Sequence, residues 1–159
     1  MMKRREFVTL LGSAAAWPLA ARAQQPDGGR RIGVLIAGQA QDDSIAQAQV
    51  AAFRQELEKL GWAEGRNVRI DARFAAGDLD RVQSYAVELA RLKPDVALVQ
   101  TSIGLTSMLR ESPSLPIVFV QINDPVGSGF VASLARPGGN VTGFTAPCSP
   151  VSRPYCRIS

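Results

Sequence analysis

The sequence predicts an α/β fold with a doubly wound parallel sheet, and three observations support this. Short apolar runs of strand length recur along residues 31–145. Amphipathic helical patterns separate these runs, and polar or glycine-rich turns close each unit. Strands that alternate with helices form βαβ units around a parallel sheet, which carries helices on both faces.

The first unit begins with residues 31–37, an apolar run without alternation. Such a run is typical of a strand buried on both faces. Residues 44–60 follow with helical periodicity, and Gly61 is placed to cap that helix. Residues 67–74 alternate between polar and apolar, which predicts a second strand near an edge of the sheet. The side chains expected to face the core from the helix are Ile45, Ala48, Ala52, Phe53, Leu57 and Leu60.

A second helix begins where Asp78 or Asp80 can cap it, and Pro94 ends it. Residues 95–99 form the third predicted strand. The helix is expected to bury one stripe of side chains, namely Leu79, Val82, Tyr85, Ala86, Leu89 and Leu92.

The last units are shorter. Residues 103–110 predict a short helix capped by Thr101 or Ser102. Residues 116–120 predict a fourth strand, and a helix is expected near residues 126–135. A turn then leads into a fifth strand that starts at Val141. The runs expected to be most buried are 32–37, 96–99 and 117–120.

The amino terminus predicts export. A basic start at residues 3–5 precedes an apolar run over residues 8–20, and the small-x-small site Ala-Arg-Ala occupies residues 21–23. This pattern is typical of a secretory signal peptide cleaved after Ala23, because the apolar run is too short to span a bilayer. A flexible lead-in is expected over residues 24–30.

Net charge does not indicate a nucleic-acid partner. Residues 1–23 hold four basic residues and one acidic residue, a net of +3 out of the chain's +4. The rest therefore carries +1, without a basic run or interleaved aromatic residues. The expected mature protein is periplasmic and does not bind nucleic acid.

Catalysis and cofactors are not expected. The chain contains no histidine, the commonest general base and metal ligand, so Ser-His-Asp and Cys-His mechanisms are excluded within it. A Gly-x-Gly-x-x-Ala pattern at residues 127–132 lies about six residues beyond its predicted strand, behind Pro125, and lacks the acidic residue that a dinucleotide site has about twenty positions later. We expect close packing there, with no cofactor and no metal.

Polar residues follow three predicted strands, at residues 38–43, 100–102 and 121–125. The carboxyl ends of parallel strands meet at one edge of a sheet, and ligands bind there where the strand order reverses. Such residues also cap helices, so capping is the alternative explanation for each of them. Several amides and hydroxyls at one edge, Gln100 among them, favour binding.

With these units placed, the sequence resembles the substrate-binding proteins of ABC transporters, and in particular the subfamily of tryptophan- and aromatic-amino-acid-type binders. One matching string is Ser-Leu-Ala-Arg-Pro-Gly-Gly-Asn-Val-Thr-Gly at residues 133–143. Others are Pro-Ile-Val-Phe-Val at 116–120, Asp-Pro-Val at 124–126 and Glu-Gly-Arg-Asn-Val at 64–68. The start Arg-Arg-Glu-Phe at 4–7 also resembles a twin-arginine export signal, and the general secretory route stays open.

The resemblance implies one Rossmann-like lobe of a type I periplasmic-binding fold over residues 31–145. It implies capture of a small molecule, such as an amino acid or another carboxylate, for an ABC permease in the inner membrane. The α-helix start after the third strand favours a carboxylate. The ligand-binding positions carried over are Gln39, Ala40, Thr101, Ser102, Asn123 and Asp124.

The chain departs from that family in length, because two lobes need about twice as many residues. Residues 146–159 lose all periodicity and hold Cys148 and Cys156, so we expect an irregular segment, out of frame or a genuine short terminus. An oxidising compartment would permit a disulfide between the two cysteines. Two other hypotheses compete with a binding protein: an exported α/β enzyme, and the ligand-sensing lobe of a regulator.

Overall fold

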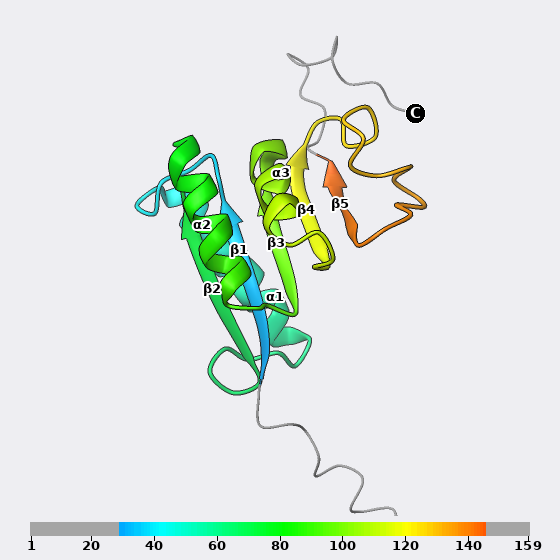
Figure 1. Ribbon diagram of the computed structural model, residues 1–159. Helices are drawn as coiled ribbons and strands as arrows, with labels where there is room; N and C mark the ends of the chain where they lie inside the picture. The colour runs from blue at the N-terminus through cyan, green and yellow to red at the C-terminus, as the bar shows by residue number, and fades with distance from the viewer. Residues whose placement is uncertain (1–28, 146–159) are drawn as a thin grey trace, which may run out of the picture.

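Five parallel strands form one sheet in the computed structural model, which describes residues 29–145, and three helices pack against it (Figure 1). The order along the chain is β1 (Arg30–Ile36), α1 (Ser44–Lys59), β2 (Val68–Phe74), α2 (Leu79–Arg91), β3 (Val96–Gln100), α3 (Thr101–Glu111), β4 (Ile117–Ile122) and β5 (Val141–Thr145). The α/β class and the parallel sheet predicted from sequence are confirmed. β1 begins at Arg30, the last residue of the predicted lead-in.

The strands lie in the order β2-β1-β3-β4-β5, and all pairs are parallel. β2 is therefore an edge strand, as its alternation predicts. The chain steps from β1 outward to β2, then returns past β1 to β3. Since crossovers are right-handed, this reversal places α1 on one face and α2 and α3 on the other. The sheet is doubly wound, and its switch point lies between β1 and β3.

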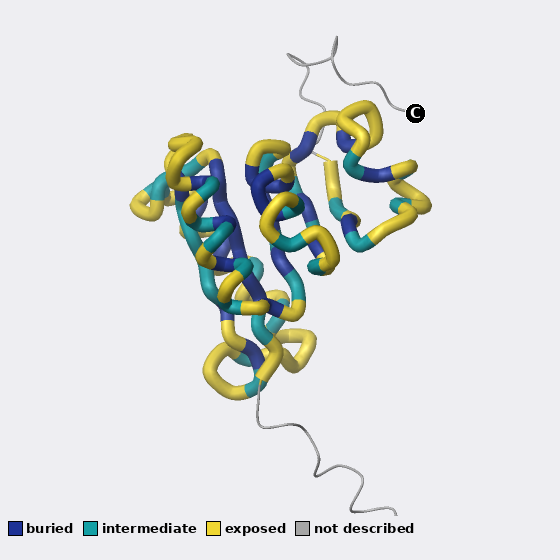
Figure 2. The backbone as a smooth tube through the Cα atoms, in the orientation of Figure 1, coloured by how far each residue is buried: buried dark blue, intermediate teal, exposed yellow. Residues whose placement is uncertain are grey.

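Each face has its own core. The α2–α3 face buries Leu89, Leu105 and Met108 of the helices against Leu35 and Phe119 of the strands. The α1 face has a smaller core, over β1 and β2. Burial is deepest along β1, which Figure 2 shows in dark blue between its neighbours. The members of the smaller core are Ile32, Val34, Ile36, Ala46, Val50, Val68 and Ile70.

Aspartates start the first two helices. The Asp43 carboxylate accepts hydrogen bonds from the backbone N–H groups of Ile45 and Ala46, at 2.8 and 3.1 Å. Asp78 caps α2 in the same way, so it is the N-cap and Asp80 is not. These side chains satisfy backbone donors that a helix start leaves free.

The predicted buried face of α1 is confirmed for Phe53 and Leu57 and is wrong for its other four members. Ala46 and Val50 are buried, with Phe53 and Leu57 packed beside them, whereas Ile45 is 61% exposed. The remaining predicted members, Ala48, Ala52 and Leu60, are also exposed. The helix carries two overlapping apolar stripes, and the sheet takes the one whose small Ala46 allows close approach. Sequence periodicity does not distinguish the two stripes.

The stripe of α2 is confirmed apart from its first member. Val82, Ala86 and Leu89 are buried, and Tyr85 and Leu92 pack against the same core. Leu79, the first residue of the helix, is 62% exposed.

No helix forms over residues 126–135, which is a second correction. The segment is a series of turns in which Phe130 N–H donates to the Pro125 carbonyl at 3.0 Å. Two glycines, Gly127 and Gly129, disfavour a helix there, because each costs about 1 kcal/mol relative to alanine. Val131 nevertheless reaches the core on the α2–α3 face, so this connection covers that side of the sheet.

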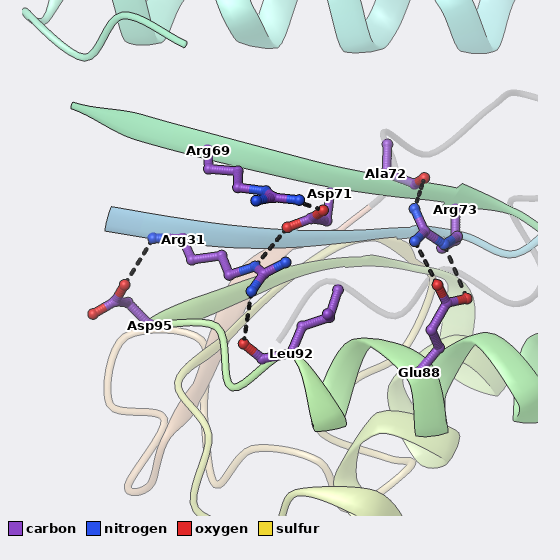
Figure 3. Close-up of polar contacts among 8 residues, drawn as sticks. All are labelled: Arg31, Arg69, Asp71, Ala72, Arg73, Glu88, Leu92 and Asp95. Carbon is purple, nitrogen blue, oxygen red and sulfur yellow. Dashed lines mark hydrogen bonds and ion pairs between the residues drawn. The ribbon is translucent and has the colours of Figure 1, made fainter. Parts of the chain in front are cut away.

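Charged side chains line the β2 edge on the α2 side (Figure 3). Arg31 Nε donates to Asp71 Oδ2 at 2.6 Å, and Arg69 lies 3.6 Å from the same carboxylate. Farther along, Arg73 Nε donates to Glu88 of α2 at 3.1 Å. Charged side chains on an edge strand oppose pairing with a strand of another molecule, so these residues protect the β2 edge from such pairing.

These pairs shift carboxyl pKa values. The hydrogen bond from Arg31 lowers the pKa of Asp71 below its ordinary value, and the charges of Arg31 and Arg69 add to the effect against desolvation. The hydrogen bond from Arg73 lowers the pKa of Glu88. The backbone N–H of Arg31, followed by the Arg30 side chain, lowers the pKa of Asp95. All three carboxylates are therefore stabilised in the ionised form by folding.

Three predictions fall wholly or mostly outside the described residues: the signal peptide with its cleavage site after Ala23, the lead-in up to residue 28, and the terminal segment 146–159 with both cysteines. Within residues 29–145, no helix combines the length and apolar character needed to cross a membrane.

Candidate functional site: an amide cluster at the carboxyl edge of the sheet

Three glutamine side chains meet where β1, β3 and β4 end. Gln100 is 4% exposed, and its Nε2 donates to Gln39 Oε1 at 3.0 Å and to Gln121 Oε1 at 2.6 Å. Its own Oε1 accepts from the Gly38 N–H at 3.4 Å. The buried amide of Gln100 therefore ties together three strand ends at the switch point of the sheet. We call Gln39, Gln100 and Gln121 the amide cluster.

The backbone at this edge adopts unusual conformations. Four non-glycine residues in the described part have positive φ. Ala76 (55°) and Thr101 (70°) follow strands at this edge, and Gln121 (59°) lies within β4, directly before its end at Ile122. Positive φ is costly for any residue with a Cβ and most of all for a β-branched one. Strained backbone of this kind concentrates at ligand sites. One of these residues, Gln121, belongs to the amide cluster, and another, Thr101, follows its member Gln100 directly.

The start of α3 differs from the starts of α1 and α2. Its N-cap is Gln100, whose side chain donates to Gln39 and Gln121 and makes no hydrogen bond to the helix. Thr101 Oγ1 accepts only a long contact of 3.5 Å from the Gly104 N–H. The predicted cap Ser102 is therefore wrong, whereas Thr101 makes a long contact of the capping type although the helix is assigned from Thr101 with Gln100 as its N-cap. α3 begins two residues earlier than the predicted 103–110. Backbone donors at such a start favour an anion.

The structure brings some of the predicted site residues together. Gln39 and Gln100 are hydrogen-bonded, and a methyl group added to Gly38 would lie 3.9 Å from Thr101 Cγ2 and 3.8 Å from Gln100 Oε1. Ala40 is half-buried beside Gln39, and its carbonyl accepts from Asp43 N–H at 3.2 Å. Ser102 is exposed at the α3 start.

The two positions after β4 lie at the same edge and are exposed. The Asp124 carboxylate accepts from the Gly127 N–H at 2.7 Å, and a methyl group added to Gly127 would collide with that carboxylate. This explains the first glycine of the Gly-x-Gly pattern by close packing in a turn. The Asp124 side chain therefore stabilises the turn after β4. The amide of Asn123 is exposed at the same edge.

Gln121 was not singled out from the sequence, although it begins the polar run 121–125. Its contact with Gln100 arises from its positive φ and from a register shift between Val120 and Ile122 in the β4–β5 pairing. Neither feature has a sequence signal. Among residues 29–145, no group of three or more His, Cys, Asp or Glu side chains could hold a metal ion.

The fold and this edge define a class: an α/β lobe with neutral hydrogen-bonding groups gathered at the switch point of a parallel sheet. A family model described as "ABC transporter substrate binding protein" matches residues 33–152, which is most of the chain. The chain belongs to this family of ABC transporter substrate-binding proteins.

Two individual relatives are also binding proteins. A tyrosine-binding protein from Clostridioides difficile (strain R20291) is 33% identical over 91 residues, which cover 57% of this chain and 26% of the relative. A ligand-free, open structure of a substrate-binding protein with adhesive properties from Clostridium difficile superposes with a TM-score of 0.67 at 28% identity. The match covers 77% of this chain and 41% of that one.

Two further structures share the fold. A conserved domain protein from Vibrio cholerae O1 biovar El Tor gives a TM-score of 0.68 at 27% identity, over 78% of this chain and 40% of that one. An ABC domain in complex with L-Trp from Streptococcus pneumonia gives 0.65 at 24% identity, over 74% and 39%. The chain thus spans about two fifths of the solved relatives it matches.

Proposed function

We propose that this protein is the exported solute-binding component of an ABC transporter, and that residues 31–145 form its N-terminal ligand-binding lobe. It would capture a small molecule in the periplasm and deliver it to a permease in the inner membrane. Membership of the substrate-binding family supports the binding role. The amino-terminal pattern of residues 3–23 supports export.

The observation that carries the proposal is the amide cluster beside the α3 start. Gln100 holds Gln39 and Gln121 in place through two hydrogen bonds, so the polar groups of three strand ends are fixed before a ligand arrives. Sites with groups fixed in advance lose less conformational entropy on binding. Thr101 and the first N–H groups of α3 stand next to this cluster and would receive a carboxylate.

An amino acid fits these groups best. Its carboxylate would bind at the α3 start, and its ammonium group would bind to carbonyl oxygens of the amide side chains, which accept hydrogen bonds. The name of the tyrosine-binding relative supports an aromatic amino acid. Asn123 and Asp124 complete the proposed contact set from the β4 side. A catalytic role is not proposed, because the edge holds no acid–base pair and the chain has no histidine.

Nuclear magnetic resonance titration of this chain with L-tryptophan tests the site. We expect shifts of the amide signals at residues 38–40, 100–102 and 121–124, and weak binding in the millimolar range. One lobe supplies only part of the contacts that a two-lobed binder makes, and each missing hydrogen bond removes about 0.5–1.5 kcal/mol. Indole, which lacks the carboxylate, should leave residues 101 and 102 unshifted.

The matched variants are Gln100→Ala and Gln55→Ala. Gln100→Ala should remove the shifts, whereas Gln55 is exposed on α1 and its loss should leave them unchanged. Shifts confined to another surface would refute the site. Micromolar or tighter binding by this chain would refute the half-site interpretation. Calorimetry on the tyrosine-binding relative provides the positive control.

Export has its own test. We expect the mature protein to begin at Gln24, since Ala-Arg-Ala at residues 21–23 follows the apolar run. Intact-mass measurement of the protein from a periplasmic fraction checks this. A mature mass that still includes residues 1–23 would contradict it.

A further inference from the structure

The turn between α1 and β2, residues 60–67, carries two exposed apolar side chains at the amino-terminal end of the sheet. Leu60 is 75% exposed and Trp62 is 39% exposed, and only Gly61 separates them. Figure 1 shows this turn at the lower end of the molecule, where β1 and β2 begin. The amide cluster lies at the other end of the strands, about 23 Å away along the seven residues of β1.

Asn67 holds this turn in a fixed shape. Its Oδ1 accepts from the Ala63 N–H at 2.8 Å, and its Nδ2 donates to the Gly61 carbonyl at 2.8 Å. The Trp62 N–H donates to the Leu57 carbonyl at 2.8 Å, which ties the turn to the last turn of α1. The backbone that presents the two apolar side chains therefore needs little further ordering when it meets a partner.

The fold gathers basic side chains at this end of the lobe, although the sequence scatters them. Arg69 lies in register with Arg31 on the neighbouring strand, and the Arg31 guanidinium donates to the Leu92 carbonyl at 3.2 Å (Figure 3). The end of α2 therefore lies against the start of β1 and adds its own cations. The exposed basic residues that share this end of the lobe are Arg66, Arg69, Arg91 and Lys93.

Most carboxylates near these cations are bound by other arginines, in the pairs Glu64–Arg54, Asp95–Arg30 and Asp71–Arg31. Among residues 29–145, Arg66, Arg91 and Lys93 form no ion pair, and Arg69 reaches a carboxylate only at 3.6 Å. Glu58 on the last turn of α1 is exposed and opposes their charge. The balance of these exposed groups remains positive, so this end of the lobe attracts anions.

We propose that the turn 60–67, together with Arg66, Arg69, Arg91 and Lys93, is a docking surface for a bilayer that contains anionic phospholipids. We call it the basal surface. Tryptophan favours the headgroup region of a bilayer, and an exposed leucine beside it enters the boundary with the acyl chains. Each Arg or Lys near an anionic leaflet strengthens binding about fivefold. An acidic protein could bind the cations, but only a bilayer offers an apolar layer directly beneath its charges.

This surface lies opposite the candidate ligand site. Because the amide cluster is at the carboxyl ends of the strands, a lobe that docks through the basal surface keeps its ligand edge in solution. Docking would therefore concentrate the protein at a membrane without covering the site. The inference depends neither on the ligand nor on the proposed site.

Co-sedimentation of the full chain with extruded vesicles tests the proposal. We expect binding to phosphatidylcholine vesicles that contain about 40% phosphatidylglycerol, and binding weaker by about tenfold or more to vesicles of phosphatidylcholine alone. Raising the salt concentration to about 0.5 M should remove most of this difference, because the Debye length falls to about 4 Å.

Matched double variants locate the charge effect. Arg66→Gln/Arg69→Gln should weaken binding to the anionic vesicles about 25-fold, at about fivefold for each charge. Arg81→Gln/Arg136→Gln removes two exposed charges at the start of α2 and in the connection before β5, and should change binding by less than about threefold. Binding through any other segment would respond equally to the two double variants. Urea unfolding confirms that each variant folds.

Insertion of the apolar pair has its own readouts. Leu60→Ser should weaken binding about fivefold, whereas Leu134→Ser, which changes another exposed leucine, should not weaken it. The chain has two tryptophans, so with Trp17→Phe in every protein Trp62 is the sole indole. Its fluorescence emission should shift to shorter wavelength on the anionic vesicles.

Equal binding to the two kinds of vesicle, equal effects of the two double variants, or an unshifted Trp62 emission would overturn the inference. Binding to polyglutamate that is as tight as binding to vesicles, and that is insensitive to Leu60→Ser, would assign the surface to an acidic protein and would also overturn it. The titration of the amide cluster with L-tryptophan reports on the opposite end of the sheet. Failure of either experiment therefore leaves the other as a separate test.

Discussion

Gln100 Nε2 lies 2.6 Å from Gln121 Oε1. The side chain at the end of β3 therefore holds the side chain of Gln121, which lies at the register shift in β4. The donor belongs to a buried residue and the acceptor to an exposed one. The pair connects the core of the sheet to the surface on which a ligand would rest. It gives the candidate site a rigid base without any charged group.

Replacing the donor of this pair should destabilise the fold in a pH-dependent way. Gln100→Glu keeps the shape but places a carboxylate against the oxygens of Gln39 and Gln121. We expect a loss of about 1–3 kcal/mol in the free energy of unfolding at neutral pH. Protonation restores a donor, so the difference from wild type should narrow as the pH falls. Urea unfolding at several pH values measures this, and a pH-independent difference would contradict it.

Acid should weaken the protein through its paired carboxylates. Folding lowers the pKa of Asp71, Glu88 and Asp95 below their ordinary values of 3.8 for aspartate and 4.5 for glutamate. As the pH falls, the unfolded chain binds protons first, so stability present above these values is lost through the still lower folded pKa values. We expect a constant free energy of unfolding near neutrality and a decline below about pH 4–5.

Asp71→Asn should flatten that decline, because it removes one of the contributing groups. It should also cost about 1–2 kcal/mol at neutral pH, since the Arg31 side chain loses its ionised partner. Asp42→Asn changes an exposed residue in the loop before α1 and is the control. If the free energy of unfolding of Asp71→Asn changed with pH in parallel with that of the wild type, the Arg31–Asp71 pair would not contribute to the pH dependence.

Gly143 should not tolerate a side chain. A methyl group there would collide with the Phe119 carbonyl on the neighbouring strand, so Gly143→Ala requires β5 to move away from β4. We expect a loss of about 1–3 kcal/mol, in the range of overpacked sites. Gly139→Ala is the control, because no atom outside the neighbouring residues lies within 4 Å of the added carbon. Thermal unfolding of the two variants should differ clearly.

The N-cap of α1 should contribute measurably to stability. Asp43→Ala removes the acceptor for two backbone N–H groups, and a loss of about 1 kcal/mol is expected. Asp42→Ala, one residue earlier and exposed, should change the free energy of unfolding by less than about 0.5 kcal/mol. Equal effects of the two substitutions would assign the change to charge instead of capping.

The sequence by itself determined the fold class and the family. Apolar runs at 31–37, 95–99 and 116–120 fall on β1, β3 and β4. Burial on both faces is confirmed for β1, whereas Leu98 of β3 and Val118 and Val120 of β4 are only half-buried on the α1 side. Asp78 starts a helix because its side chain accepts backbone hydrogen bonds, and Gly61 follows one because it adopts a positive φ. Both effects depend on the residue type itself, so the sequence predicts them. The polar residues after β1 and β3 likewise predicted that Gln39 and Gln100 share one edge.

Tertiary structure alone decided the rest. The buried face of α1 depends on which of two apolar stripes the sheet accepts. Gln121 joins Gln100 only through a positive φ and a register shift between strands. Each of these depends on contacts between residues far apart in the chain, and no local pattern of residues encodes them.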